Sequence, residues 1–273
     1  MKFFFVFIIF SIAISSLGQN LLNHQSTLPQ KLEETSALVY LNGTFWTIND
    51  SGGEPVLYSF NRNGVLLNSV RIKDAENYDW EALAINNSHL FIGDFGNNFG
   101  SRRNLKIYAI QLSELQNQEA KVDFVIQFHY PEQTEWIKTK WKTQFDCEAM
   151  LASDSLIHLF TKDWKNNIGA HYTLDLKKGV QKATFSNFLN ANVLITDATW
   201  DYTKNAFYLV GYKEYIPYVL RYSDLKQVEF EQRISFPDNY KYQLEGITFL
   251  NDTLFITTEN SAIDASLLYF VPN

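Results

Sequence analysis

Asp79-Trp80-Glu81-Ala82-Leu83 is the stretch that decides the fold, because its pattern recurs along the chain. Each copy has a small or acidic residue, then Ala or Gly, then a mostly apolar stretch. A turn follows in each copy, made of residues that tolerate tight hairpins. The copies begin at Ser36, Glu81, Glu148, Asp197 and Glu245. Such self-similarity indicates a fold built from repeated units.

Each copy predicts three or four β-strands. A second apolar strand follows the turn, at residues 44–48, 89–92, 156–161, 206–210 and 253–257. A third strand carries a tyrosine each time, at Tyr58, Tyr108, Tyr172, Tyr222 and Tyr269. A fourth is visible around residues 66–72, 122–129, 182–188 and 230–236. Four antiparallel strands at a spacing of roughly 45–50 residues are typical of propeller blades.

The sequence therefore predicts an all-β propeller of five blades with four antiparallel strands each. The last copy lacks a fourth strand, so we expect an N-terminal strand at residues 26–28 to close the ring and cover the exposed sheet edge. The interval between Glu81 and Glu148 is long, which predicts an insert of extended loops at about residues 112–143. The alternative is a six-bladed ring with one degenerate blade.

The first residues are typical of a targeting segment. Lys2 precedes an apolar run at residues 3–14, and small residues follow up to Gly18. A basic start, an apolar run and small residues predict a signal peptide at residues 1–18, cleaved near Gly18. The run is shorter than the roughly 20 residues of a membrane span. We expect residues 19–273 to form one exported domain, secreted or periplasmic, without a stable membrane span; the alternative is an uncleaved N-terminal anchor.

Composition limits the partners and predicts a large core. The chain has 22 Phe, 15 Tyr and 6 Trp but only 19% charged residues, which favours a large, well-filled apolar interior. A formal net charge of −7 disfavours nucleic acid or an anionic membrane as partner. Cys147 is the single cysteine, so internal disulfides are excluded and a buried, inert thiol is expected.

Carboxylates recur at the first position of the repeat. In a propeller the innermost strands line the central channel, so this position forms a ring. Crowded carboxylates repel one another unless protons, cations or hydrogen bonds intervene. Calcium suits such a set, because it accepts about six to eight oxygen ligands in flexible geometry. The alternative is that the acids cap backbone N–H groups of neighbouring blades. The candidate metal ligands are Glu81, Glu148, Asp197 and Glu245, with Asp79 and Asp146 as ligand-binding residues two positions earlier.

Three of the strand openings resemble those of the SdiA-regulated family of exported β-propellers. They lie at residues 79–83, 146–150 and 244–248, and they are also similar to the openings of phytase-like and esterase-like propellers. The resemblance implies an exported propeller with a calcium site in or near the channel, and no established reaction. By motif position it carries over Glu81, Glu148 and Glu245. Ser36 and Ile195 depart from the pattern, which places a symmetric metal site in doubt.

Two tryptophans in the insert are candidate ligand-binding residues. Trp136 and Trp141 alternate with Lys138, Lys140 and Lys142. Exposed tryptophan beside lysine suits a sugar ring or an anionic group. The alternative is that these rings pack the insert onto the blades.

The function predicted from these features is an exported, calcium-associated module that binds a small-molecule or extracellular ligand. An alternative is a metal-dependent hydrolase of phytase-like, lactonase-like or esterase-like type, and a third is a structural scaffold. No familiar catalytic or zinc motif occurs, so no catalytic residue is predicted.

Overall fold

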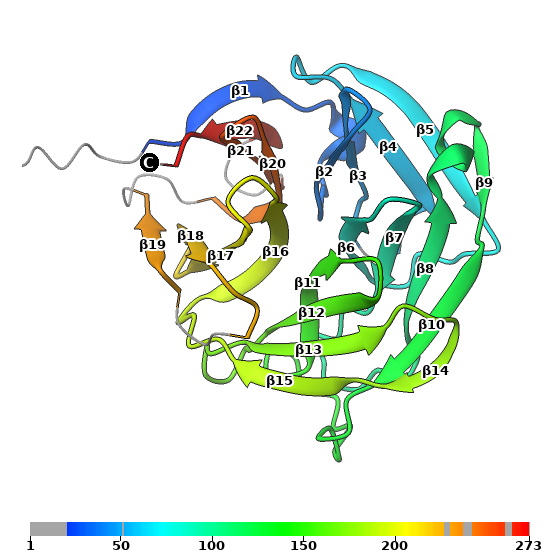
Figure 1. The fold of residues 1–273 in the computed structure, drawn as a ribbon, viewed down its shortest axis with the longest axis vertical. Coiled ribbons are helices and arrows are strands. Elements are labelled where there is room, and N and C mark those ends of the chain that lie inside the picture. The colour runs from blue at the N-terminus through cyan, green and yellow to red at the C-terminus, as the bar shows by residue number, and fades with distance from the viewer. Residues whose placement is uncertain (1–20, 51, 227–229, 237–241, 260–263, 273) are drawn as a thin grey trace, which may run out of the picture.

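The protein is a ring of five β-sheets arranged around a central axis (Figure 1). The computed structural model describes residues 21–50, 52–226, 230–236, 242–259 and 264–272. The predicted five-bladed propeller is confirmed, and the predicted signal peptide lies outside the described residues. In the described part of the chain, no helix is long and apolar enough to cross a membrane.

Each blade contains four antiparallel strands, named here from the innermost outward. Blade 1 has β2 (Val39–Leu41), β3 (Thr44–Thr47), β4 (Val56–Phe60) and β5 (Leu66–Lys73). Blade 2 has β6 (Trp80–Ile85), β7 (His89–Asp94), β8 (Leu105–Gln111) and β10 (Phe124–His129). Blade 3 has β11 (Asp146–Ala152), β12 (Leu156–Lys162), β13 (Ala170–Asp175) and β15 (Thr184–Phe188). Blade 4 has β16 (Leu194–Asp201), β17 (Ala206–Lys213), β18 (Ile216–Tyr222) and β19 (Gln232–Ser235).

Blade 5 is closed by the N-terminal strand. It contains β20 (Leu244–Leu250), β21 (Thr253–Thr258) and β22 (Ser266–Phe270), and β1 (Asn23–Thr27) is its outermost strand. β1 runs antiparallel to β22 (Figure 1). The predicted closure is confirmed, although the strand begins at Asn23 and the predicted range covered only its end.

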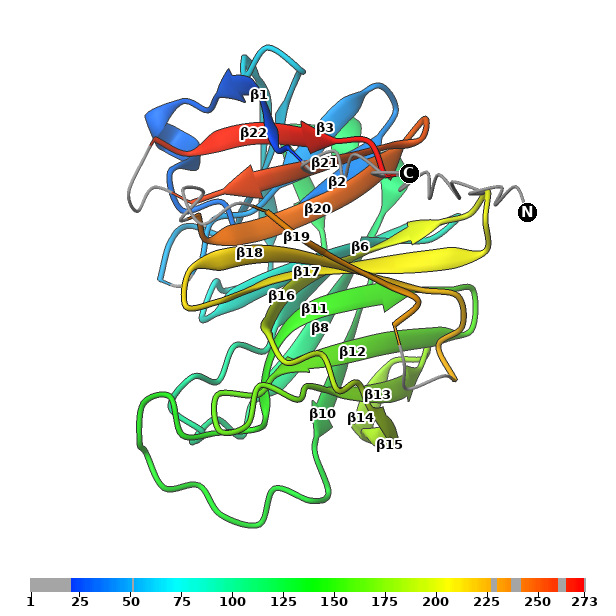
Figure 2. The same ribbon diagram turned by 90° about the vertical axis from the view of Figure 1, so that its left-hand side faces the viewer.

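One extra strand is added to the outer edge of blade 1 and another to the outer edge of blade 2. β9 (Glu119–Lys121) follows blade 2 strand β8 and a short 3-10 helix η2 (Leu112–Gln116), yet it pairs in parallel with β5 of blade 1. β14 (Gly179–Lys182) lies between two strands of blade 3 and pairs in parallel with β10 of blade 2. The sequence predicted extended loops for the insert, but η2 and β9 lie within it. Its remaining loop, between β10 and β11, extends beyond the sheets (Figure 2).

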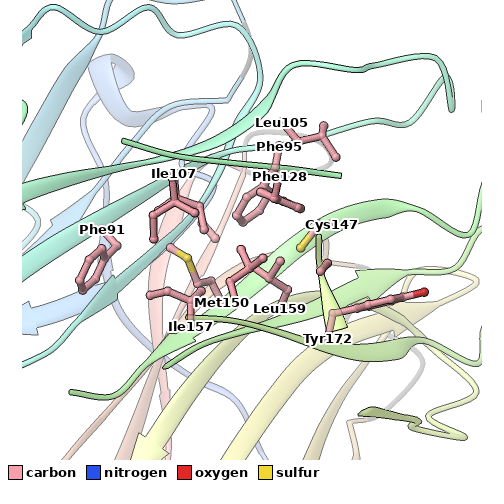
Figure 3. Packing of buried hydrophobic residues seen from close by; sticks show 14 of the residues in the cluster. Phe91, Phe95, Leu105, Ile107, Phe128, Cys147, Met150, Ile157, Leu159 and Tyr172 are labelled. Atoms are coloured by element: carbon pink, nitrogen blue, oxygen red, sulfur yellow. The ribbon is translucent and has the colours of Figure 1, made fainter. Parts of the chain in front are cut away.

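The apolar core consists of five clusters, one at each junction between neighbouring blades. Figure 3 shows the cluster between blades 2 and 3, where Phe128 and Met150 pack from opposite sheets. Cys147 belongs to this cluster and is fully buried. Burial raises the pKa of its thiol to about 12, which agrees with the expected inert cysteine.

A buried histidine pair lies at the junction of blades 3 and 4. Nδ1 of His158 lies 3.0 Å from Nε2 of His171, and the other ring nitrogen of His171 lies 3.1 Å from the Asn187 side-chain oxygen. Burial, together with the neighbouring His171, lowers the pKa of His158 to about 4. The folded state thus resists protonation of this pair.

We expect this pair to make stability depend on acidity. The pKa of an unfolded histidine is near 6.5, so between pH 6.5 and pH 4 the unfolded chain binds a proton that folded His158 does not. The free energy of unfolding is therefore at its full value above pH 6.5 and falls as the pH drops toward 4. The loss for His158 is on the order of 3 kcal/mol. His158→Gln keeps a hydrogen-bonding group but cannot titrate. Denaturant unfolding at pH 7 and pH 4 should show a smaller loss for this variant, and equal losses would contradict the prediction.

Candidate functional site at the channel mouth

A β-bulge at the start of the innermost strands directs the acidic side chains. In β6, Trp80 pairs with Asp94 and Ala82 pairs with Gly93, so Glu81 between them has no partner in the ladder. Glu148 in β11 and Glu245 in β20 are left out in the same way. A bulge re-aims a side chain, and all three line one cavity of about 470 Å³ at this end of the channel.

The predicted ring is shifted by one residue in blade 4. Ile195 pairs with Gly211 and Asp197 pairs with Val210, so the bulged residue is Thr196. Thr196, and not Asp197, is thus equivalent to Glu81, and its hydroxyl donates to the carbonyl of Leu244 in blade 5.

Asp197 instead holds three blades together. Its Oδ2 accepts the backbone N–H groups of Ile247 at 2.7 Å and Leu38 at 3.3 Å, which belong to blades 5 and 1. Asp197 is fully buried and is absent from the lining of the cavity. At this position the acid is a cap on backbone groups, as in the alternative from the sequence.

Asp50, Asp79 and Glu81 form a compact group of carboxylates. One oxygen from each lies within 4.8 Å of the others. Asp50 follows the second strand of blade 1, whereas Asp79 and Glu81 come from blade 2. Gly96 lies beside the group: a Cβ added there would lie 2.6 Å from Oδ2 of Asp79 and closer still to Oε1 of Glu81. The glycine therefore lets the two carboxylates lie against the backbone, where a larger residue would displace them.

Negative charge in this group is costly without a cation. Burial and the neighbouring Asp50 raise the pKa of Asp79 to about 7, although Arg102 opposes the rise. The Arg102 Nη1 lies 3.7 Å from Oδ2 of Asp79. Burial, again with Asp50, raises the pKa of Glu81 well above its ordinary value. A bound cation would offset this repulsion.

Glu148 is already paired. Its Oε2 accepts from the Lys162 Nζ at 2.5 Å, and both side chains are almost fully buried. The Lys162 Nζ also lies 4.9 Å from the ring centre of Trp164 and 5.1 Å from that of Tyr212. Lys162 therefore neutralises Glu148 within an aromatic setting, leaving this acid outside the group that faces Gly96.

Two other predicted acids have different surroundings. Burial raises the pKa of Glu245 to about 8, with Lys162 lowering it and Glu259 raising it. Asp146 is fully buried and accepts the Trp164 Nε1–H at 2.6 Å and the Asn97 N–H at 2.5 Å. Asp146 therefore holds the Trp164 ring and the Asn97 backbone in place at the channel mouth, while Glu245 lines the cavity.

Aromatic side chains surround the mouth. Trp141 is 54% exposed, lines the cavity and lies 5.7 Å from Trp164 between ring centres. On another part of the lining, Tyr212 and Tyr215 stack in parallel with ring centres 6.0 Å apart. Trp136 does not line the cavity and packs under Arg103, whose Cζ is 4.0 Å from its ring centre. Of the two predicted tryptophans, only Trp141 reaches the site.

Among the described residues, those with positive φ that are neither Gly, Asn nor Asp all lie at this mouth. Glu214 and Tyr215 form the turn between β17 and β18 with φ of 53° and 64°, and Trp141 has φ of 59°. Tight turns elsewhere, such as Asn42-Gly43 between β2 and β3, use residues that tolerate positive φ. Bulky residues in left-handed backbone cost energy and are often retained for function.

The predicted site omitted several lining residues. Asp50 and Glu259 follow the second strands of blades 1 and 5, and their acidic character was visible in the sequence. Lys162 and Tyr212 hold the equivalent position in blades 3 and 4. Each pairs with the residue two positions before the bulge of its blade: Lys162 pairs with Asp146, and Tyr212 pairs with Leu194. No sequence motif marks that position, because its residue type differs in each blade.

Comparison with known proteins places the fold but not the chemistry. No family model matches the chain, and no curated protein matches it in sequence. A crystal structure of Myxococcus xanthus glutaminyl cyclase matches with a TM-score of 0.56 and 10% identity, covering 94% of this chain and 97% of that chain. A glucose dehydrogenase matches with a TM-score of 0.53 and 7% identity, covering 91% and 99%. These structural neighbours are β-propeller enzymes, and at such low identity they establish the architecture alone.

Proposed function

We propose that this chain is an exported, calcium-dependent binding module. In this proposal Asp50, Asp79 and Glu81 hold the cation, and a small-molecule ligand occupies the aromatic cavity beside it. The observation that carries it is the compact group of three carboxylates, with one oxygen from each within 4.8 Å of the others. An all-oxygen donor set from two blades favours calcium over softer metals. The SdiA-regulated-like strand openings are consistent with this proposal.

The test is thermal unfolding of residues 19–273 after chelation, with calcium or magnesium then added back. Calcium at a hundred times its Kd should stabilise the protein by about 2.7 kcal/mol, which raises the Tm by roughly 5–10 °C. Glu81→Gln should abolish the rise. Gly96→Ala should also abolish it, because the new Cβ would displace the carboxylates of Asp79 and Glu81 although all three acids remain.

Glu245→Gln is the matched control. Glu245 is as buried as Glu81 and lines the same cavity, but it is not one of the three clustered carboxylates. This variant should keep the calcium response. A wild-type protein without a calcium response, or an equal loss in Glu245→Gln and Glu81→Gln, would refute the proposed site.

Metal-dependent hydrolysis, of phytase-like, lactonase-like or esterase-like kind, is a second candidate function. The observation that favours it is Glu245, a carboxyl group with a raised pKa of about 8 in the same cavity, outside the three clustered acids. When bound, the cation would polarise a carbonyl or phosphoryl oxygen. Glu245 would accept a proton from the attacking water. Turnover of lactone, ester and phosphoester substrates with calcium, lost in Glu245→Gln while its calcium response persists, would favour hydrolysis over binding alone.

A further inference from the structure

A second cavity, of about 220 Å³, lies against the outer strands of blade 3. The sheet contributes side chains from β12, β13 and β15, and the long loop between β10 and β11 covers them from one side. The lining residues that the argument uses are Glu132, Phe145, Thr161, Asp163, Tyr172, Phe185 and Phe188. None of them lines the acidic cavity at the channel mouth.

A β-bulge in the outermost strand of blade 3 turns two phenylalanines to the same face. Phe188 pairs with Ala170 and Phe185 pairs with Tyr172, so β15 has two residues between the phenylalanines where β13 has only one. In a regular strand, residues three apart point to opposite faces. The extra residue re-aims the strand, and both rings line the cavity with 38% and 53% of Phe185 and Phe188 exposed. An occupant can therefore contact both rings.

The aromatic rings of the lining meet at large angles. The ring centres of Phe185 and Phe188 lie 5.0 Å apart with 61° between the planes, and those of Tyr172 and Phe185 lie 5.5 Å apart with 72°. The Tyr172 hydroxyl points away from the other labelled side chains of the apolar cluster in Figure 3. Phe145, which is partly buried, lines the cavity from the loop side. Rings set at such angles surround a compact group, and their faces attract positive charge.

Carboxylates are the only charged groups among the described lining residues, and they belong to Glu132 and Asp163. Asp163 is buried and accepts N–H groups within its own loop, so it does not need an occupant. Glu132 is exposed and lies beside Tyr172, whose pKa is raised by burial and by the charge of Glu132. An anion in the cavity would be repelled, and an uncharged apolar group would strip water from Glu132 without replacing it. A cation suits both the acid and the ring faces.

The hydrogen-bonding capacity of the lining narrows the class of cation. A primary ammonium group carries three donors and is strongly hydrated, so it loses water that rings cannot replace. The Thr161 hydroxyl oxygen already accepts the Ala170 N–H at 3.0 Å. An ammonium group that carries methyl groups in place of hydrogens needs no acceptors and buries its methyl groups against the rings.

We infer that this cavity binds a small methylated ammonium compound, of the quaternary kind that choline represents. The methyl groups contact Phe145, Phe185 and Phe188, and the positive charge lies beside Glu132. The site goes beyond the proposed function, because it shares no residue with the proposed calcium site or with the cavity beside it.

The test is a titration of residues 19–273 with choline, by calorimetry and saturation-transfer NMR, in the presence of a chelator that keeps the calcium site empty. Two analogues separate charge from shape. In one, a tert-butyl group replaces the trimethylammonium group and removes the charge; the other, ethanolamine, keeps the charge but lacks the methyl groups. We expect saturable binding of choline and binding of both analogues that is weaker by about tenfold or more.

Two variants assign the binding to this cavity. Phe188→Ala changes an exposed side chain on an edge strand, so it should fold normally and weaken choline binding about tenfold. Glu132→Gln should weaken the binding of choline but not that of the uncharged analogue. The matched controls are Glu135→Gln, an exposed acid of the same loop outside the lining, and Tyr202→Ala, an aromatic residue that is 73% exposed and also outside it. Both controls should bind choline like the wild type.

Three outcomes would overturn the inference. The first is absence of saturable choline binding, and the second is equal affinity for choline and its uncharged analogue. The third is unchanged choline affinity in Phe188→Ala, which would place the ligand elsewhere, such as among the aromatic rings of the channel mouth. Because the titration is done without calcium, each outcome is independent of whether the calcium site exists.

Discussion

Asp197→Ala should lower the free energy of unfolding by about 3–5 kcal/mol, and hence the Tm by roughly 10 °C. The carboxylate of Asp197 is the acceptor for two backbone N–H groups from two other blades. Its removal leaves both donors buried without a partner. Denaturant unfolding monitored by tryptophan fluorescence gives the change directly.

Two controls separate this bridging role from the mere loss of a buried acid. Asp197→Asn keeps an oxygen in place as acceptor, so its loss should be much smaller than that of Asp197→Ala. Asp163 is nearly as buried, but it accepts the N–H groups of Lys165 and Asn166 within its own loop. Asp163→Ala should cost about 1 kcal/mol. An Asp197→Ala variant as stable as Asp163→Ala would refute the role assigned to Asp197.

Removal of residues 19–27 should cost about 5 kcal/mol or more, a large share of the stability of a typical domain. These residues include β1, the outermost strand of blade 5, and Leu22, which is buried in the cluster between blades 4 and 5. Their loss exposes the edge of β22. Denaturant unfolding and size-exclusion chromatography would compare this chain with one that begins at residue 19.

A peptide of residues 19–28 provides the control. Added to the shortened chain, it should restore the unfolding midpoint by pairing with β22, whereas a scrambled peptide should not. Equal unfolding midpoints for the two chains, or equal rescue by both peptides, would contradict the importance assigned to the closing strand.

The five-bladed architecture was predictable because each strand buries apolar side chains against a neighbouring sheet. The third-strand tyrosines Tyr58, Tyr108 and Tyr172 all lie where the pattern placed them, in β4, β8 and β13. The parallel strands β9 and β14 were not predictable, since each has a short, largely exposed segment that pairs outside its own repeat. Such pairing depends on where the neighbouring blade's edge lies and not on local sequence.

The candidate site was predictable in part, and the error at Asp197 has a physical reason. In blades 2, 3 and 5 the bulged acid is followed by Ala82, Ala149 or Gly246. A small residue is needed there because innermost strands approach closely: a Cβ on Gly246 would lie 2.8 Å from the backbone of Ala37. In blade 4 an aspartate takes that place and imitates the acid of the repeat. Only the strand register distinguishes the two positions.

The strands β9 and β14 have a consequence for how the molecule opens. β9, from the blade 2 segment, pairs with the outer strand of blade 1, and β14, from the blade 3 segment, pairs with the outer strand of blade 2. These two latches link blades 1, 2 and 3 in series. In native-state hydrogen exchange, amides of these three blades should therefore open together as one unit of high protection. Blades 4 and 5 carry no such latch among the described residues, so transient opening of the ring should begin at a junction that involves one of these two blades.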